Sequence, residues 1–120
     1  MSDSRLSGFY RLQVDERIDA LEAGGWIAAP DADALRDGRQ VLSLRAADKM
    51  IENVIGTFGL PMAVAPNFRV DGCDYLVPLV VEEPSIVAAL SAGARIARKA
   101  GGFTTELAES LLAGQVHLAG

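Results

Sequence analysis

Residues 62–81, MAVAPNFRVDGCDYLVPLVV, decide the fold because two apolar runs flank an Asp-Gly pair in the middle of this stretch. An Asp-Gly pair between such runs is the strongest short-range signal for a β-hairpin with a two-residue turn. With Asp71 and Gly72 as the turn, Val70 pairs with Cys73 and the two runs form antiparallel strands. The sequence therefore predicts a hairpin at the centre of the chain.

The register of this hairpin predicts which of its faces is buried. Counting outward from the turn places Val64 opposite Leu79 and produces one face on which every side chain is apolar. The residues of that face are Met62, Val64, Phe68, Val70, Tyr75, Val77, Leu79 and Val81. Pro66 and Pro78 lie within the runs and cannot donate to the ladder, so they predict an edge or a bulge.

Helical spacing of apolar residues predicts helices on both sides of the hairpin. The expected helices cover 14–23, 32–36, 44–54 and 84–99. In the third the apolar stripe is Ala47, Ile51, Val54 and Ile55, and in the fourth the stripe is Ile86, Leu90, Gly93 and Ala97. We also expect short strands at 103–107 and 115–118, with a turn or short helix at 109–112. N-terminal helices, a hairpin, a long helix and short strands together predict an α+β fold.

Composition excludes several classes of protein. The chain has 120 residues, a mass of 12.7 kDa and a net charge of −5, which argues against a general nucleic-acid binder. A single Cys and a single His exclude an internal disulfide and the usual Cys/His zinc sites, so we expect no metal. No apolar run approaches the roughly 20 residues of a membrane span, and the first ten residues do not look like a secretory signal. We therefore expect a cytoplasmic protein that does not bind a membrane.

The junction between the second strand and the last helix, VEEPS at 81–85, is the strongest candidate for chemistry. With Pro84 as the first helical residue, Glu83 occupies the N-cap, where Ser, Thr, Asp and Asn are preferred. Glu83 also continues the apolar face of the strand, whereas Glu82 points the other way. Burial would raise the pKa of the Glu83 carboxyl and suit it to general-acid catalysis. The alternative is that both glutamates form a solvated helix start.

A second candidate lies at the end of the helix expected at 44–54. Glu52 and Asn53 adjoin its apolar stripe, and Asp48 and Glu52 are like charges one helical turn apart. A cation or a ligand outside the helix would offset their repulsion, whereas the plainer interpretation is an exposed helix edge. Cys73 and His117 are interpreted as ordinary residues of the hairpin and of a terminal strand.

These residues carry a resemblance to a known family. The stretches MIENVIGTFGLPMAVAPNF at 50–68 and LVPLVVEEPSIVAAL at 76–90 resemble hydroxymethylglutaryl-CoA reductase in its class II, bacterial and soluble form. The segments SRLSGFYRLQVDERID at 4–19 and GGFTTE at 101–106 are similar to the same family. The ENVIG and EEPS motifs, at their observed separation, are the specific part of the match.

The resemblance implies an activity and roles for particular residues. The family reduces 3-hydroxy-3-methylglutaryl-CoA to mevalonate and CoA with two molecules of NADPH or NADH. Its catalytic glutamate corresponds to Glu83, which would donate a proton to the thioester or aldehyde oxygen. Ser85 and Ile86 would lie near the hydroxymethylglutaryl group. The resemblance places the ENVIG segment at a homodimer interface, where Glu52 and Asn53 would approach the substrate or CoA. Arg11 would meet a CoA phosphate.

The resemblance also has limits. The family's catalytic Lys, Asp and His, and its cofactor-binding domain, have no counterpart in residues 1–120. We therefore expect this chain to be the N-terminal part of the large, substrate-binding domain and to be inactive alone. Its exposed apolar faces would make it poorly soluble or self-associating. The alternatives are a non-catalytic module that binds CoA or dimerises, and an unrelated small α+β domain.

Overall fold

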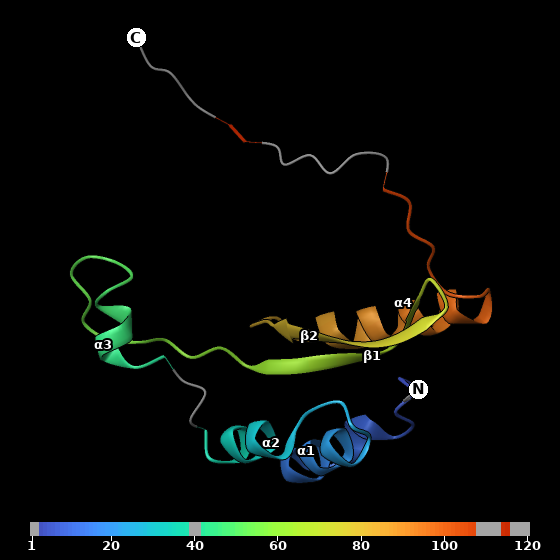
Figure 1. Ribbon diagram of the computed structural model, residues 1–120, viewed down its shortest axis with the longest axis horizontal. Helices are drawn as coiled ribbons and strands as arrows, with labels where there is room; N and C mark the ends of the chain where they lie inside the picture. The colour runs from blue at the N-terminus through green and yellow to red at the C-terminus, as the bar shows by residue number, and fades with distance from the viewer. Residues whose placement is uncertain (1–2, 39–41, 108–113, 116–120) are drawn as a thin grey trace.

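The computed structural model describes residues 3–38, 42–107 and 114–115, and these form an α+β arrangement around one antiparallel hairpin (Figure 1). The elements are η1 (Phe9–Arg11), α1 (Val14–Ala23), α2 (Ala29–Arg36), α3 (Leu44–Ala47), β1 (Met62–Val70), β2 (Cys73–Val80) and α4 (Ile86–Lys99). Helix α4 packs on β1, and α1 packs on α2. In Figure 1 the α1–α2 pair lies below the hairpin, and α3 stands to its left at the start of the chain that leads into β1.

Helix α1 has the bounds that the sequence predicts, and both of its ends are capped. At the start, the backbone N–H of Gln13 donates to the Glu16 carboxylate at 2.8 Å. At the end, the N–H of Trp26 donates to the carbonyl of Leu21 at 2.9 Å, while Gly25 adopts the left-handed conformation with φ 71°. This is a Schellman motif, which uses a glycine after the helix to satisfy the last carbonyl groups.

The hairpin turn is confirmed, but the outer half of the predicted register is wrong. Val70 pairs with Cys73 and Phe68 with Tyr75 as expected, whereas Val64 lies opposite Pro78 and not Leu79. A bulge between Ala65 and Phe68 shifts the register by one residue. The shift moves Met62 and Val64 to the other face, and Ala63 and Ala65 take their places beside Leu79 and Val77.

The bulge has a physical cause in Pro66 and Asn67. Pro66 has no N–H to give to the ladder. Asn67 adopts the left-handed conformation, with φ 77°, and its N–H donates to the carbonyl of Ser4 at 3.0 Å instead of to β2. Its side-chain amide donates to the carbonyl of Ser91 in α4 at 3.1 Å. The extra residue therefore connects β1 to the N-terminal chain and to α4.

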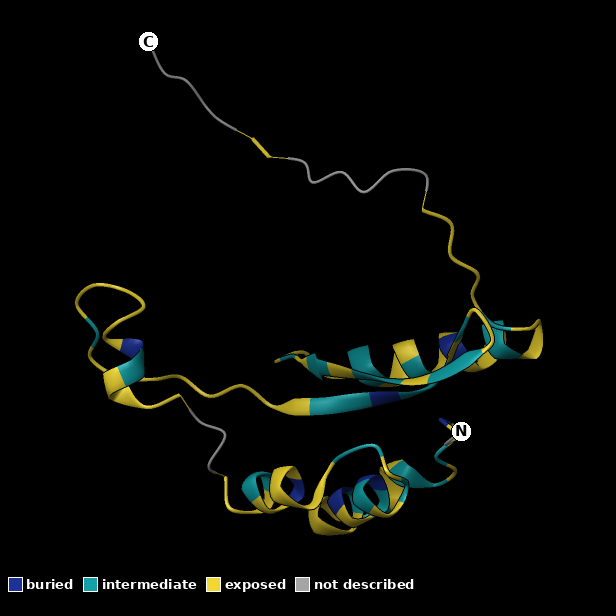
Figure 2. Cartoon of the chain, in the orientation of Figure 1, coloured by how far each residue is buried: buried dark blue, intermediate teal, exposed yellow. Residues whose placement is uncertain are grey.

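Helix α4 begins later than predicted and buries a different stripe. Ser85 has φ 71°, so the helix begins at Ile86 rather than Pro84, and Ser85 rather than Glu83 is the N-cap. The less exposed positions include Val87, Ser91, Ala94 and Arg98, whereas Leu90 and Gly93 are exposed. Figure 2 shows buried, intermediate and exposed stretches alternating along this helix. The predicted stripe was thus displaced by about one residue around the helix.

The helix predicted at 44–54 is wrong beyond its first turn. Helix α3 ends at Ala47, and a last helical hydrogen bond runs from the N–H of Ile51 to the carbonyl of Ala47 at 3.3 Å. Residues 51–53 are bends and not helix. Ser43 caps the turn as expected, accepting a hydrogen bond from the N–H of Ala46 at 3.2 Å. The predicted stripe at Ile51 and Ile55 is exposed, and a short helix without a packing partner is marginal in water.

Of the two short strands predicted near the C-terminus, the one at 103–107 forms only a single bridge. Phe103 forms a single parallel bridge to Val70, and 104–107 make no ladder. The turn expected at 109–112 and most of the strand expected at 115–118, with His117, lie outside the described residues. None of the helices within the described ranges has the length and apolar character that crossing a bilayer requires.

Candidate functional site

The strand-to-helix junction that contains Glu83 lies on the surface. Strand β2 ends at Val80, and Glu82 and Glu83 are both exposed. The expectation that Glu83 is desolvated is therefore wrong for the described chain. The alternation of the strand stops before it reaches this residue.

The start of α4 adjoins these carboxylates and offers free backbone donors. The first helical bond at this end runs from the N–H of Ala89 to the carbonyl of Ser85 at 2.8 Å, so the N–H groups ahead of it have no partner within the helix. Ser85 is exposed and Ile86 is half-buried. These free donors, at the positive end of the helix dipole, can stabilise negative charge on a ligand placed there, and the two glutamates precede them directly in the chain.

The ENVIG motif lies in an exposed loop rather than on a helix. Glu52 and Asn53 are exposed, and Asn53 adopts the left-handed conformation with φ 56°. Val54 lines two neighbouring hollows of about 390 and 400 Å³ formed by residues between Leu42 and Leu60. Neither hollow is lined by Glu83.

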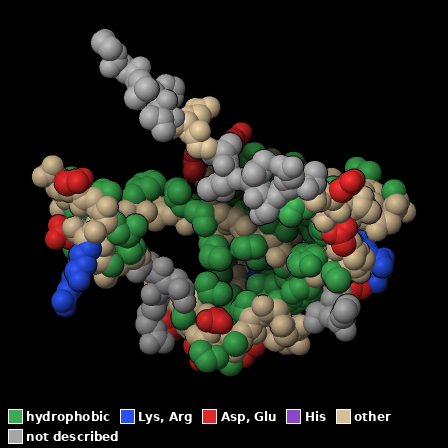
Figure 3. Space-filling view, turned by 45° about the horizontal axis from the view of Figure 1, so that its top comes forward, with side chains coloured by type: hydrophobic (Ala, Val, Ile, Leu, Met, Phe, Trp, Pro, Cys, Tyr) green, Lys and Arg blue, Asp and Glu red, His purple; other side chains and the backbone are tan. Residues whose placement is uncertain are grey.

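Apolar side chains concentrate around this loop. The space-filling view shows hydrophobic side chains over the segment that contains α3 and across the central face of the molecule (Figure 3). Phe58 is 89% exposed and Ile55 is fully exposed. Other exposed apolar residues of the same segment are Leu42, Leu44, Met50, Ile51 and Leu60. We call residues 42–60 the apolar loop.

The hairpin attaches both motifs to its open end. Met62 pairs with Val80, and beyond this pair the N–H of Val81 donates to the carbonyl of Pro61 at 3.2 Å. The ENVIG segment leads into Pro61, and the two glutamates follow Val81 directly. The fold thus brings the chain that follows the ENVIG motif and the chain that precedes the EEPS motif to one end of the sheet.

Arg11 lies apart from these motifs, in the 3-10 turn η1. Its Nε donates to the hydroxyl of Tyr10 at 2.9 Å, and its guanidinium carbon lies 5.3 Å from the centre of the Tyr10 ring. Among the described residues no carboxylate lies within ion-pair distance of Arg11. Its remaining N–H groups point to no acidic partner there and can take an anion.

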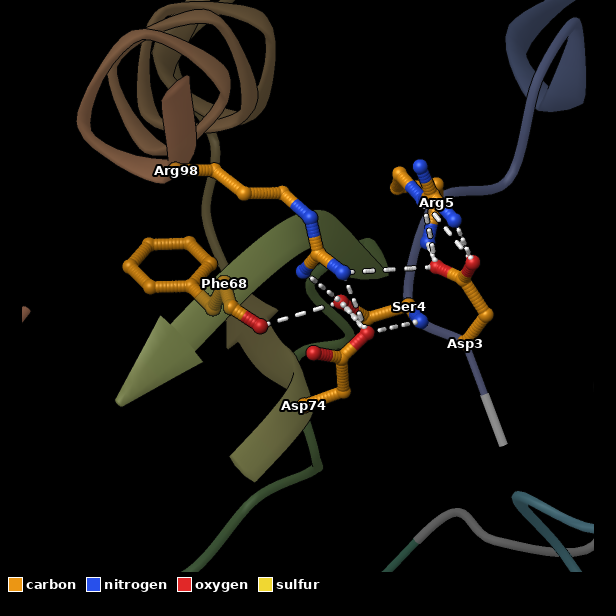
Figure 4. Close-up of polar contacts among 6 residues, drawn as sticks. All are labelled: Asp3, Ser4, Arg5, Phe68, Asp74 and Arg98. Atoms are coloured by element: carbon orange, nitrogen blue, oxygen red, sulfur yellow. Dashed lines mark hydrogen bonds and ion pairs between the residues drawn. The ribbon is translucent and has the colours of Figure 1, made fainter. Parts of the chain in front are cut away.

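A polar cluster that the sequence analysis missed joins the N-terminal chain to the hairpin and α4 (Figure 4). Arg98 donates to the Asp74 carboxylate at 2.8 Å and to the Ser4 hydroxyl oxygen at 3.2 Å. The backbone N–H of Ser4 donates to the same Asp74 oxygen at 2.9 Å. The hydrogen bond from Arg98, assisted by the backbone N–H of Ser4, holds the pKa of Asp74 below its ordinary value. The one signal in the sequence was a charged residue, Asp74, inside an otherwise apolar strand.

A second anchor holds the GGFTTE segment to the hairpin turn. The backbone N–H of Thr105 donates to Asp71 at 2.9 Å, and its hydroxyl donates to the other oxygen of the same carboxylate. These bonds lower the pKa of Asp71. The rings of Phe103 and Phe68 stack with centroids 5.7 Å apart. In the part of the chain that the structure describes, no His, Cys, Asp and Glu side chains cluster closely enough to hold a metal ion.

Comparison with known proteins assigns the chain to a family. Residues 13–120 match the model for hydroxymethylglutaryl-coenzyme A reductase, so Arg11 lies just ahead of the match. The 3-hydroxy-3-methylglutaryl-coenzyme A reductase of Archaeoglobus fulgidus is 49% identical over 115 residues, which cover 96% of this chain and 26% of that protein. The reductase of Methanothermobacter thermautotrophicus is 37% identical over 67 residues, covering 52% of this chain and 17% of that protein.

Solved structures show the same relationship. A reductase from Streptococcus pneumoniae superposes with a TM-score of 0.80 at 39% identity, over 86% of this chain and 24% of that one. The class II reductase from the same organism, bound to NADPH in open conformations, superposes with a TM-score of 0.76 at 40% identity, over 82% of this chain and 26% of that one. This chain therefore spans about a quarter of the length of the Archaeoglobus fulgidus and Streptococcus pneumoniae reductases, and it belongs to the hydroxymethylglutaryl-coenzyme A reductase family.

Proposed function

We propose that this chain is the N-terminal part of the large, substrate-binding domain of a reductase that converts 3-hydroxy-3-methylglutaryl-CoA to mevalonate and CoA with two molecules of NADPH or NADH. The observation that carries the proposal is the EEPS junction, with Glu83 at the open end of the hairpin to which the ENVIG segment also leads. The coverage of a quarter of the relatives' length supports a segment rather than the whole catalytic unit. We place the protein in the cytoplasm, like the soluble class II form that it resembles.

Glu83 is the proton donor in this proposal. When a hydride reaches the thioester carbon, negative charge develops on the carbonyl oxygen, and a neighbouring carboxylic acid neutralises that charge by giving up its proton. When the resulting hemithioacetal collapses, its O–H proton returns to the Glu83 carboxylate, the C–S bond breaks and CoA leaves as a thiolate that is protonated by a group outside this chain. The protonated Glu83 can then give its proton to the aldehyde oxygen in the second reduction. The nicotinamide cofactor would supply the hydrides, held by residues outside this chain.

Residues around Glu83 and in the apolar loop complete the substrate contacts. Ser85 and Ile86, at the start of α4, adjoin the hydroxymethylglutaryl group. Glu52 and Asn53 contact the substrate or CoA, and Arg11 binds a CoA phosphate with the guanidinium N–H groups that Tyr10 leaves free.

Glu83 needs a drier environment than this chain provides alone. A carboxyl group keeps its proton near neutral pH only where its charged form is desolvated or repelled. Because Glu83 is exposed here, the remaining three quarters of the reductase, or a second subunit, must cover it. The exposed side chains of the apolar loop support a homodimer through the ENVIG region.

A second function is favoured by the same exposure of Glu83. The chain could act as a non-catalytic module that dimerises or binds CoA without turnover. The two functions differ in whether a chain that carries this segment consumes reduced nicotinamide in the presence of hydroxymethylglutaryl-CoA.

The test replaces each glutamate of the junction in turn, in a reductase chain that contains this segment. Glu83→Gln keeps the shape and removes the acid, so we expect kcat for reduced-nicotinamide consumption to fall by about 10²- to 10⁴-fold. The matched control, Glu82→Gln, removes the neighbouring carboxylate, and we expect its kcat to stay close to that of the unaltered enzyme. We expect residues 1–120 alone to show no turnover. A Glu83→Gln enzyme with an unaltered rate would remove this residue from the mechanism.

A further inference from the structure

We propose that Ser4 is a positioning residue, whose burial between the hairpin and α4 sets the place of the N-terminal arm, residues 3–11, and through it the Arg11 guanidinium. The inference rests on the proposed function, because the ligand of Arg11 is a phosphate of the CoA ester. Ser4 itself touches no ligand in this account and acts through the arm.

The first observation is that Ser4 is fully buried and that both its backbone and its hydroxyl are hydrogen-bonded. Its hydroxyl donates to the carbonyl of Phe68 at 2.9 Å, and its carbonyl accepts the N–H of Asn67 at 3.0 Å. Its backbone N–H donates to Asp74, and its hydroxyl oxygen accepts from Arg98. Buried polar groups are satisfied in this way where a segment has one fixed position. Ser4 therefore docks specifically into the strand bulge.

The second observation is that the site that binds Ser4, which we call the dock, contains two opposite charges supplied by different elements of the fold. Asp74 comes from β2 and Arg98 from α4 (Figure 4). The side chain of each is only 15% exposed. A carboxylate oxygen of Asp3, on the arm itself, lies 3.5 Å from a guanidinium nitrogen of Arg98. Removal of the Asp74 or the Arg98 charge would leave the other charge without its ion-pair partner in a site that is largely shielded from water. The cluster thus holds the arm and joins β2 to α4.

The third observation links the dock to Arg11. The arm folds into consecutive tight turns, in which the N–H of Phe9 donates to the carbonyl of Leu6 at 3.3 Å and that of Arg11 to Gly8 at 2.8 Å. At its far end, Arg17 of α1 donates to the carbonyls of Phe9 and Tyr10 at 3.3 and 3.2 Å. The arm is therefore held at both ends, so release of Ser4 would displace Arg11 from its place relative to the hairpin.

The experiment uses a reductase chain that contains this segment and the variant Ser4→Ala, which removes only the hydroxyl. Ser7→Ala is the matched control, because Ser7 lies on the same arm and is exposed. Two quantities are measured: the steady-state KM and kcat for hydroxymethylglutaryl-CoA, and the hydrogen-exchange rate of the Asn67 amide. Asp74→Asn is a second, independent variant of the same dock.

We expect Ser4→Ala to raise KM by about tenfold with kcat nearly unchanged, because the loss is in binding and not in the chemical step. The Asn67 amide should exchange faster, and Ser7→Ala should change neither quantity. Adding Ser4→Ala to Arg11→Ala should raise KM little further, because both changes remove one interaction.

The inference is overturned if KM stays constant while Asn67 exchanges faster, if exchange is unchanged, or if kcat falls together with the rise in KM. It is also overturned if the effects of Ser4→Ala and Arg11→Ala on KM simply add. Failure of the proposed reductase function has a different signature, an unaltered rate for Glu83→Gln, which does not depend on the arm.

Discussion

Val81 donates its backbone N–H to the carbonyl of Pro61 at 3.2 Å, one step beyond the last pair of the hairpin. This bond joins the chain arriving from the ENVIG segment to the chain leaving for Glu83. Two motifs that lie about thirty residues apart in the sequence are thereby attached to the same end of one rigid element. A site assembled from both motifs of one chain would form at this end of the hairpin.

The apolar loop predicts how the chain associates. We expect Phe58→Glu to shift the sedimentation coefficient of the chain towards that of a monomer, because a charge at an exposed aromatic position disrupts a hydrophobic contact. Leu107→Glu, also highly exposed but outside the loop, is the control and should leave association unchanged. Equal effects of the two substitutions would contradict an interface centred on the loop.

The Asp74–Arg98 pair predicts an acid limit for stability. The folded-state pKa of Asp74 is lowered by Arg98, so its contribution is complete above the unfolded pKa of about 3.9 and is lost as the pH falls towards the folded value. We expect Asp74→Asn to lower the free energy of unfolding at pH 7 by roughly 1–3 kcal/mol and to flatten the pH dependence below about pH 4.

Urea unfolding across pH 2–7 measures this difference. Asp3 and Arg5 also belong to the charged surroundings of the pair, and both are exposed. A loss of stability that is the same at pH 2.5 and pH 7 would show that the Asp74 charge is not responsible.

The contact between α4 and β1 predicts a strong dependence on small residues. Ala94 of α4 is 2% exposed and Ala65 of β1 is fully buried. We expect Ala94→Leu to destabilise the fold by about 1–3 kcal/mol, because a larger side chain forces the helix from the strand. Ala92→Leu, on the exposed side of the same helix, is the control and should change the unfolding midpoint little. A similar loss of stability for both variants would show that Ala94 does not lie in the contact between α4 and β1.

Two glycines should respond to alanine in opposite directions. Gly93 lies inside α4, and apart from the backbone of its own helix and its chain neighbours no atom lies within 4 Å of the position a Cβ would take. Gly93→Ala should therefore stabilise the fold by about 0.5–1 kcal/mol. Gly25 has φ 71° in the Schellman motif, so Gly25→Ala should destabilise it by about 1 kcal/mol. Thermal melts of both variants check the signs.

Local signals in the sequence predicted the elements whose cause is local. The Asp-Gly pair at 71–72 and the glycines after α1 specify turns by their own backbone freedom, and both turns form where expected. The end of α4 at Lys99, before two glycines, has the same origin.

The predictions from sequence were wrong where residues far apart in the chain determine the local structure. Asn67 leaves the ladder because Ser4 accepts its N–H, and no local pattern shows that partner. The helix expected at 44–54 had an apolar stripe, but only Ala47 of that stripe is buried, while Ile51 and Ile55 stay exposed. The burial expected for Glu83 assumed a strand that continues past Val80, and the Ser4–Asp74–Arg98 cluster joins residues too far apart in the chain to be read as a motif.

The central claim is that the EEPS junction and the ENVIG segment meet one CoA ester. A crystal structure of a reductase chain that contains this segment, with hydroxymethylglutaryl-CoA bound, tests it most directly. We predict that the Glu83 carboxyl lies within hydrogen-bond distance of the thioester oxygen, shielded from water, with Glu52 or Asn53 touching the same ligand. A bound ester that leaves Glu83 in solvent, out of reach of its carbonyl, would contradict the account.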